Sequence, residues 1–156
     1  MTDADETTSI YPAAKTSKGD DIRVNVTPID IFGTGDDVTS DEITILNSTP
    51  TVGEVGITPE FPGPGQKLTC EIIEPATDAD GDVLSYLFSW SADGTDYPEY
   101  TTVSTDGMAQ LPEGTTAKYE TWTCTAAADD GSGSGEDFST SVYVTNEPPD
   151  AAGVQI

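Results

Sequence analysis

The sequence contains no histidine, and only 5 lysine and arginine residues stand against 29 aspartates and glutamates, for a formal net charge of -24. Without histidine, neither imidazole acid–base catalysis nor a histidine-ligated metal is available. A surface this acidic repels phosphate backbones and anionic headgroups, so we expect neither nucleic acid nor an anionic membrane as a partner. The charge suits surroundings rich in calcium or salt, where cations screen self-repulsion. Solubility alone is the alternative explanation.

Long apolar runs are also missing. No stretch of ~18 apolar residues occurs, so we expect no transmembrane helix and no membrane insertion. The first nine residues, MTDADETTS, lack the basic and apolar regions of a signal peptide. If the protein is exported, we expect its signal upstream of this sequence, or another export route. No serine, cysteine or lysine lies beside a plausible base, so we do not expect an enzyme.

Alternation of apolar and polar residues dominates the sequence, whereas helical periodicity is almost absent. In one segment Leu84, Tyr86, Phe88 and Trp90 fall on the same face of an expected strand. Many short strands separated by Gly, Pro, Asp and Asn are typical of an all-β sandwich, which we therefore predict. The expected strands are residues 21–26, 42–46, 52–59, 67–73, 83–90, 97–103, 117–126 and 138–145, the sixth being weak and displaced toward an edge by Pro98.

An internal repeat divides the sequence. Residues 33–57 align without gaps on residues 132–156, so that Ile43 falls on Val142 and Ile57 on Ile156, a shift of 99 residues. Upstream, a weaker match places Val24 on Trp122. About a hundred residues is the size of one immunoglobulin-like domain, which predicts immunoglobulin-like β-sandwich repeats in tandem. We predict that residues 50–148 form one complete repeat, residues 1–49 the C-terminal half of a preceding one, and residues 149–156 the linker and first strand of a following one.

Several motifs resemble a known family. The stretch GQKLTCEIIEPATDADGDVLSYLFSWSADG, followed by YETWTCTAAADDGSGSGEDFSTSVYVTNEPP, resembles the bacterial and archaeal immunoglobulin-like repeats of large surface proteins. It is similar to the cadherin-like and PKD-like repeats. The shared features are the acidic DADGD turn, the tryptophan of the next strand, the later cysteine, an Asp-Gly turn and an Asn-to-Pro linker. The resemblance implies an extracellular stalk, spacer or adhesive unit, and some relatives bind calcium.

The two cysteines fit the same resemblance. Cys70 and Cys124 each lie in the middle of a strand pattern, and Trp90 lies between them. This order matches the cross-sheet disulfide of immunoglobulin-like domains, packed against an aromatic ring. The resemblance therefore implies a Cys70–Cys124 disulfide and an oxidising, extracellular setting. Two buried free thiols are the alternative.

Three aspartates alternate in the acidic turn. Asp78, Asp80 and Asp82 have the spacing of the first three ligands of an EF-hand, but Val83 and Ser89 stand where that loop needs glycine and glutamate. An EF-hand is therefore excluded, and a calcium site here would need further oxygens. The alternative is a solvated Asp-Gly turn. The candidate contributors are Asp129, Asp130 and Glu136 in the later acidic turn, together with Glu74 and Glu147.

Two sequons and one aromatic loop complete the candidate sites. Asn25 and Asn47 match the N-glycosylation pattern. We predict a structural segment of a cell-surface stalk, adhesin or filament, whose partners are neighbouring repeats or copies of itself. The alternative is a module that binds carbohydrate or protein through its loops. Sugar binding is the weaker alternative, because Tyr97 and Tyr100 are the only aromatic residues in a candidate binding loop.

Overall fold

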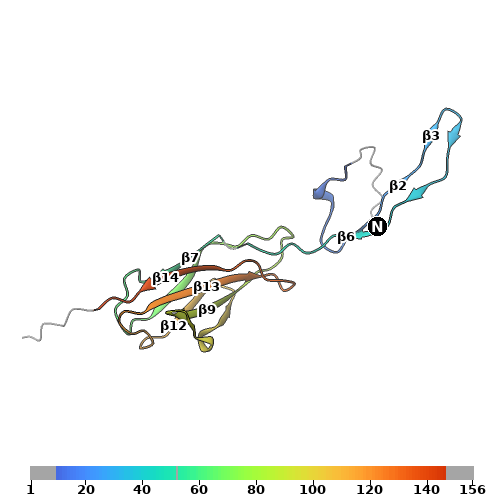
Figure 1. Cartoon of the computed structure of the whole chain (residues 1–156). Coiled ribbons are helices and arrows are strands. Elements are labelled where there is room, and N and C mark those ends of the chain that lie inside the picture. The colour runs from blue at the N-terminus through green and yellow to red at the C-terminus, as the bar shows by residue number, and fades with distance from the viewer. Residues whose placement is uncertain (1–9, 52, 147–156) are drawn as a thin grey trace, which may run out of the picture. The chain divides into compact units, whose positions relative to one another are not determined.

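The structure is a computed structural model that describes residues 10–51 and 53–146 of the 156-residue chain. The chain divides between Ser48 and Thr49 into two units (Figure 1). The predicted segment 149–156 lies outside the described residues. In the part of the chain that is described, no helix has both the length and the apolar character needed to cross a membrane.

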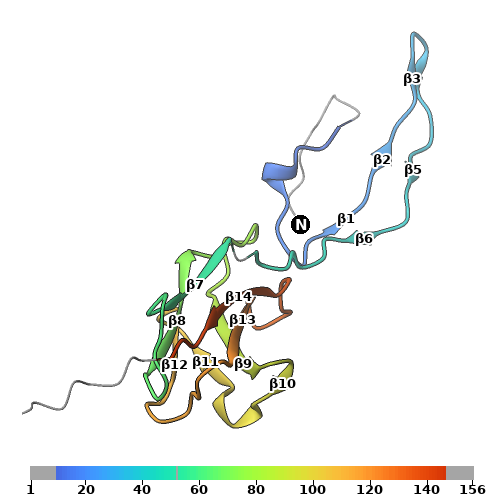
Figure 2. The ribbon, with the colours of Figure 1, turned by 60° about the vertical axis from the view of Figure 1, so that its left-hand side comes forward.

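The second unit is a sandwich of two antiparallel sheets (Figures 1 and 2). The smaller sheet has the order β12–β8–β7. In the larger sheet β9 and β13 lie side by side, β14 pairs with the far edge of β13, and both β10 and β11 pair with the other edge of β9. The bounds are β7 (Glu54–Thr58), β8 (Leu68–Glu74), β9 (Ser85–Ala92), β10 (Thr95–Asp96), the 3-10 turn η2 (Pro98–Tyr100), β11 (Thr102–Ser104), β12 (Met108–Leu111), β13 (Thr121–Asp129) and β14 (Phe138–Tyr143).

The core lies between the two sheets and follows the period-two pattern. Phe88, Trp90 and Ala92 point inward from β9, as Trp122 and Cys124 do from β13. The Trp90 and Trp122 rings meet edge to face, with centroids 6.5 Å apart. Alternate residues of a strand face opposite sides of its sheet, so these apolar positions bury one face of the larger sheet.

The strands of this unit largely match the prediction, with two differences. Residues 97–103 do not form one strand: η2 comes first, and only Thr102–Ser104 pair with β9. The prediction also lacks two strands, β10 and β12, which pair with β9 and β8 respectively. Pro98 supplies the fixed φ that favours the helical turn. In residues 108–111 apolar and polar side chains alternate over only four positions, which is too short a pattern to predict a strand.

The first unit is a long two-stranded ladder. It begins with a 3-10 turn, η1 (Ala13–Lys15). Three short pairings follow, with connecting residues between them, and none of residues 10–48 is buried. The paired strands are β1 (Asp21–Ile22) with β6 (Ile43–Thr44), β2 (Asn25–Val26) with β5 (Val38–Thr39), and β3 (Ile29–Asp30) with β4 (Gly33–Thr34).

The pairing in this ladder differs from the upstream part of the repeat alignment. Ile22 lies opposite Ile43 in the first unit, whereas Trp122 lies opposite Val142 in the sandwich. The structural equivalent of Trp122 is therefore Ile22 and not Val24. The alignment of Ile43 on Val142 is unaffected, since each lies in the second strand of its hairpin.

Candidate metal centre

The acidic turn connects β8 to β9. The Oδ1 atom of Asp78 accepts hydrogen bonds from the backbone N–H groups of Asp80 at 2.9 Å and Asp82 at 3.2 Å. Gly81 adopts a φ of +77°, a left-handed conformation that favours glycine. The DADGD sequence thus folds on itself, because a short aspartate side chain caps the backbone of the residues that follow it.

The turn brings its three carboxylates together. One oxygen from each of Asp78, Asp80 and Asp82 lies within 4.8 Å of the other two. The second oxygen of Asp78, Oδ2, is buried and has no hydrogen-bond partner. A buried carboxylate oxygen without a donor is costly, and a cation would relieve both this cost and the repulsion among three negative charges.

The donor set is chemically suited to calcium. Calcium takes six to eight hard oxygen ligands, and carboxylates, backbone carbonyls and water all serve. The three aspartates each offer one carboxylate oxygen to a shared ion, which leaves the shell incomplete. Water or backbone carbonyl oxygens would have to complete the shell.

The beginning of the turn is fixed to the residues that lead into the sandwich. Thr51 and Thr77 exchange two backbone hydrogen bonds of 2.9 Å, and their hydroxyls lie 3.0 Å apart. The backbone N–H of Ala76 donates to the Tyr86 hydroxyl at 3.3 Å. The acidic turn therefore starts from a clamped position immediately after Thr77. No sequence signal marked Thr51 and Thr77 for this role, because isolated threonines are common throughout the chain.

The later acidic turn lies at the same end of the larger sheet. Asp129, at the end of β13, is opposite Ser85, at the start of β9. Its carboxylate accepts from the N–H of Gly131 at 2.9 Å and from the Ser134 hydroxyl at 2.6 Å. Asp130 likewise accepts from the backbone N–H groups of Ser132 at 2.6 Å and Gly133 at 2.7 Å.

The carboxylates of Asp129 and Asp130 thus accept hydrogen bonds from within their own turn. Among residues 10–51 and 53–146, the triplet is the one group of three or more acidic residues close enough to share an ion. Asp129, Asp130 and Glu136 are not part of it, and neither is Glu74 at the end of β8. Glu147 lies outside the described residues. Both acidic turns lie at strand ends, as the sequence pattern predicted. The pattern could not show that the second turn is internally hydrogen-bonded.

The cysteines form the disulfide implied by the family resemblance. Cys70 on β8 and Cys124 on β13 are joined at an S–S distance of 2.08 Å, and both are fully buried. Trp90 lies opposite Cys124 in the larger sheet. The bond therefore connects the two sheets beside the largest side chains of the core, and its role is structural.

The two sequons differ in their surroundings. Asn25 is exposed on β2, and its amide donates to Asp37 Oδ2 at 3.3 Å. Asn47 is half-buried, with its amide oxygen accepting from Lys18 Nζ at 3.0 Å and its nitrogen donating to the Ser48 carbonyl at 3.0 Å. N-glycosylation at both remains a prediction.

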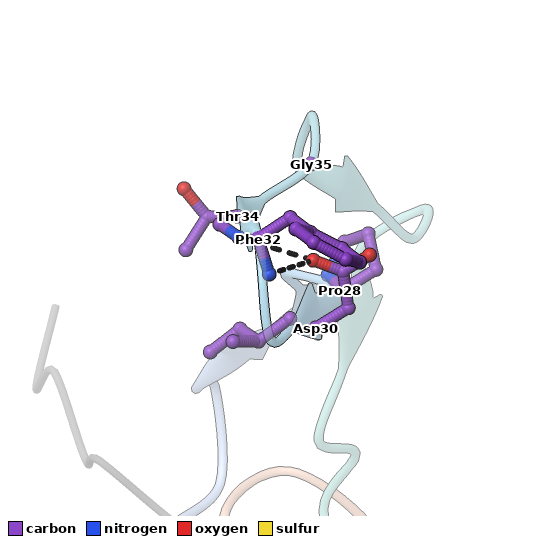
Figure 3. Close-up of a pocket in the computed structure, with 7 residues that line it drawn as sticks. Pro28, Asp30, Phe32, Thr34 and Gly35 are labelled. Atoms are coloured by element: carbon purple, nitrogen blue, oxygen red, sulfur yellow. Dashed lines mark hydrogen bonds between the residues drawn. The ribbon is translucent and has the colours of Figure 1, made fainter.

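The aromatic loop and a surface hollow are weaker candidates for ligand binding than the acidic turn. Tyr97 and Tyr100 are half-buried and stack on each other, and Tyr97 also contacts Trp122, with ring centroids 4.9 Å apart. Their rings extend the core, which leaves little open face for a sugar. A shallow hollow of about 390 Å³ lies at the hairpin tip, between Pro28 and Gly35 (Figure 3). Its carboxylate, Asp30, already accepts from two backbone N–H groups.

Solved structures resemble this chain in fold. No protein-family model and no curated protein matches the chain. A structure of the rat CD45 extracellular region, domains d3–d4, matches with a TM-score of 0.54 and 8% identity, over 90% of this chain and 72% of that one. The FN1–FN3 domains of chicken CNTN1 match with a TM-score of 0.48 and 15% identity, over 83% of this chain and 45% of that one.

At such low identity, likeness shows the fold alone. The protein is all-β, as the alternation predicted, and its second unit is an immunoglobulin-like β-sandwich, as the length of the repeat predicted. The chain spans less than half the length of the CNTN1 structure.

Proposed function

We propose that this chain is a structural segment of an extracellular stalk, adhesin or filament built from tandem immunoglobulin-like repeats, and that it binds calcium at the acidic turn. The observation that carries the calcium proposal is the buried, unpartnered Oδ2 of Asp78 beside two further carboxylates. The repeat of 99 residues between Ile57 and Ile156 supports the tandem arrangement. The buried disulfide supports an oxidising setting outside the cytosol.

In this proposal the ion acts by ordering the turn. A divalent cation on Asp78, Asp80 and Asp82 removes their mutual repulsion and supplies the missing partner of Asp78. Since Asp78 follows the Thr51–Thr77 clamp directly, an ordered turn also holds the residues that lead into the sandwich. The disulfide and the aromatic core hold the two sheets together independently of the ion. The protein would thus function as a stiff spacer, in the manner of the surface-protein repeats that its motifs resemble.

Thermal unfolding with calcium and then with chelator tests the metal. Binding to the native state alone stabilises it by RT ln(1 + [L]/Kd), about 2.7 kcal/mol at a hundredfold excess over Kd. For a domain of this size we expect the sandwich to melt roughly ten degrees higher in calcium than in chelator. Near-UV circular dichroism of the buried tryptophans reports on the sandwich and not on the hairpin unit.

A matched pair of variants localises the effect. Asp78→Asn keeps the shape of the capping side chain but removes its charge, so most of the calcium-induced rise in melting temperature should be lost. Asp106→Asn removes one carboxylate from another exposed turn, where Asp106 accepts from the Ser104 hydroxyl, and should leave the rise intact. An unchanged melting temperature in millimolar calcium, or equal loss in both variants, would refute the metal site.

A further inference from the structure

The outer face of the larger sheet carries two cross-strand rows of hydroxyl side chains. Thr123 on β13 lies between Ser91 on β9 and Ser141 on β14, and Thr125 lies between Ser89 and Ser139. The Thr123 and Ser141 hydroxyls are 2.8 Å apart. These positions alternate with the buried residues of the same strands, so they all point away from the core.

Apolar side chains flank the hydroxyl rows. At one end Val103 on β11 lies opposite Leu87, which lies opposite Ala127, with Val103 and Leu87 70% and 42% exposed. At the other end Tyr143 lies opposite Thr121 and is 52% exposed. We call this surface the uncharged face; it comprises Leu87, Ser89, Ser91, Val103, Thr121, Thr123, Thr125, Ser139, Ser141 and Tyr143, whereas Ala127 is buried.

The absence of charge from this face is unusual for this chain. Acidic residues make up 29 of its 156 residues, roughly one in five, yet none lies within the face. The nearest carboxylates are at its margin, where Asp93 accepts from the Thr121 N–H at 3.0 Å, Asp96 is opposite Ser91 and Asp129 is opposite Ser85. The smaller sheet differs, since Glu71 stands in the middle of its outer face, opposite Gly56 and Met108. The interior of a protein interface is depleted of charge in the same way, with polar groups at the rim.

We propose that the uncharged face is where a second copy of this chain docks, face to face. Two copies that each carry a charge of -24 repel one another, and the centre of this face is a surface they can bring together while the carboxylates stay at the rim. Hydroxyls both donate and accept, so rows of serine and threonine are complementary to themselves, as a two-fold interface requires. A basic partner would instead be recognised by carboxylates, which the face lacks.

The size of the face sets the strength of the contact. Four strands about 4.8 Å apart and some seven residues long, at ~3.3 Å per residue, cover roughly 400 Å² per partner. A standard interface buries about 800 Å² per partner, so this dimer is weak in dilute solution. It gains strength when copies are held close together, for example side by side on a surface. The inference deepens the proposed structural role by naming the surface through which copies meet.

Sedimentation equilibrium of the whole chain tests the proposal, at concentrations up to the millimolar range and in chelator throughout. We expect a reversible monomer–dimer equilibrium that tightens between 0.1 and 1 M NaCl, as salt screens the carboxylates of the rim. Because calcium is absent, the result is independent of the metal site: either proposal can fail while the other stands.

Two threonine-to-aspartate variants locate the contact. Thr125→Asp places a carboxylate in the middle of the face and should weaken the dimer more than about tenfold, since like charges meet across the interface. Thr69→Asp makes the same change on the outer face of the smaller sheet and should leave the dimer unchanged. Both variants must first show the melting transition of the folded sandwich. A monomer at every concentration in 1 M salt, a dimer insensitive to Thr125→Asp, or equal weakening by both variants would each overturn the proposal.

Discussion

The sandwich and the hairpin unit are both built from antiparallel pairing, yet only the sandwich buries its apolar side chains. Val142 in β14 is 8% exposed, whereas Ile43, its counterpart in the repeat, is 63% exposed. Trp122 is 1% exposed, whereas Ile22, which holds the equivalent pairing position, is only partly buried. Pairing two strands satisfies backbone groups but covers no face, so the difference comes from the second sheet.

The hairpin unit relies on polar side chains instead. Thr44 donates to Asp21 at 2.6 Å, while Thr27 and Asn25 both donate to Asp37, at 2.5 and 3.3 Å. Arg23 and Glu42 form an exposed ion pair at 3.5 Å. Exposed interactions of this kind contribute little each, because water competes for every partner. The two units should therefore respond very differently to the same perturbation.

The largest expected difference comes from the disulfide. Replacing Cys70 and Cys124 together by alanine releases a loop whose ends are 54 residues apart in sequence. Loop-closure entropy predicts a loss of about 4 kcal/mol in the free energy of unfolding of the sandwich. Hydrogen exchange of amides in the ladder, residues 21–44, should remain as in the wild type. Denaturant titration followed by tryptophan fluorescence measures the first effect, and an equal change in both units would contradict the comparison.

A pair of valine substitutions gives an intermediate effect. Val142→Ala removes two buried methyl groups and should lower the stability of the sandwich by about 2 kcal/mol. Val26→Ala is the same chemical change on β2, where the side chain is 58% exposed, and should alter the free energy of unfolding by less than ~0.5 kcal/mol. Chemical denaturation of each variant compares them directly. A large effect at Val26 would show that some partner covers the ladder in solution.

The smallest effect is a pH dependence in the ladder. Hydrogen bonds from Thr27, and then from Asn25, lower the pKa of Asp37 below its usual 3.8. Because the paired state has the lower pKa, the carboxylate favours pairing above pH 3.8, and this contribution disappears as the pH falls through the lowered value. Amide chemical shifts of residues 25–39 between pH 6 and pH 2 should show this step. Asp37→Asn should lack it, and identical titrations in the two proteins would refute the assignment.

Much of the sandwich could be predicted from sequence because period-two alternation reports directly on burial. The inward positions of Phe88, Trp90 and Trp122 follow from that pattern alone. The pairing of Ile22 with Ile43 could not be predicted, since a ladder exposed on both faces has no buried side to fix its register.

The candidate metal site was predictable only in outline. The alternation of Asp78, Asp80 and Asp82 indicated a group of carboxylates, but the buried Oδ2 of Asp78 depends on how the turn folds. Likewise, the hydrogen bonds that occupy Asp129 and Asp130 are local geometry that composition does not encode. The uncharged face becomes visible once the register aligns alternate residues of neighbouring strands.

The position of the disulfide has a consequence when the unit is pulled at its two ends. The chain is clamped on entry by Thr51 to Thr77 and near its exit by Thr145, whose N–H donates to the Pro62 carbonyl at 2.9 Å. If tension breaks these clamps, only the segments before Cys70 and after Cys124 can unfold and extend. The 54-residue separation between the cysteines withholds roughly 190 Å of contour length. An overstretched unit would thus lengthen by a short, fixed step and keep most of its strands within a closed covalent loop.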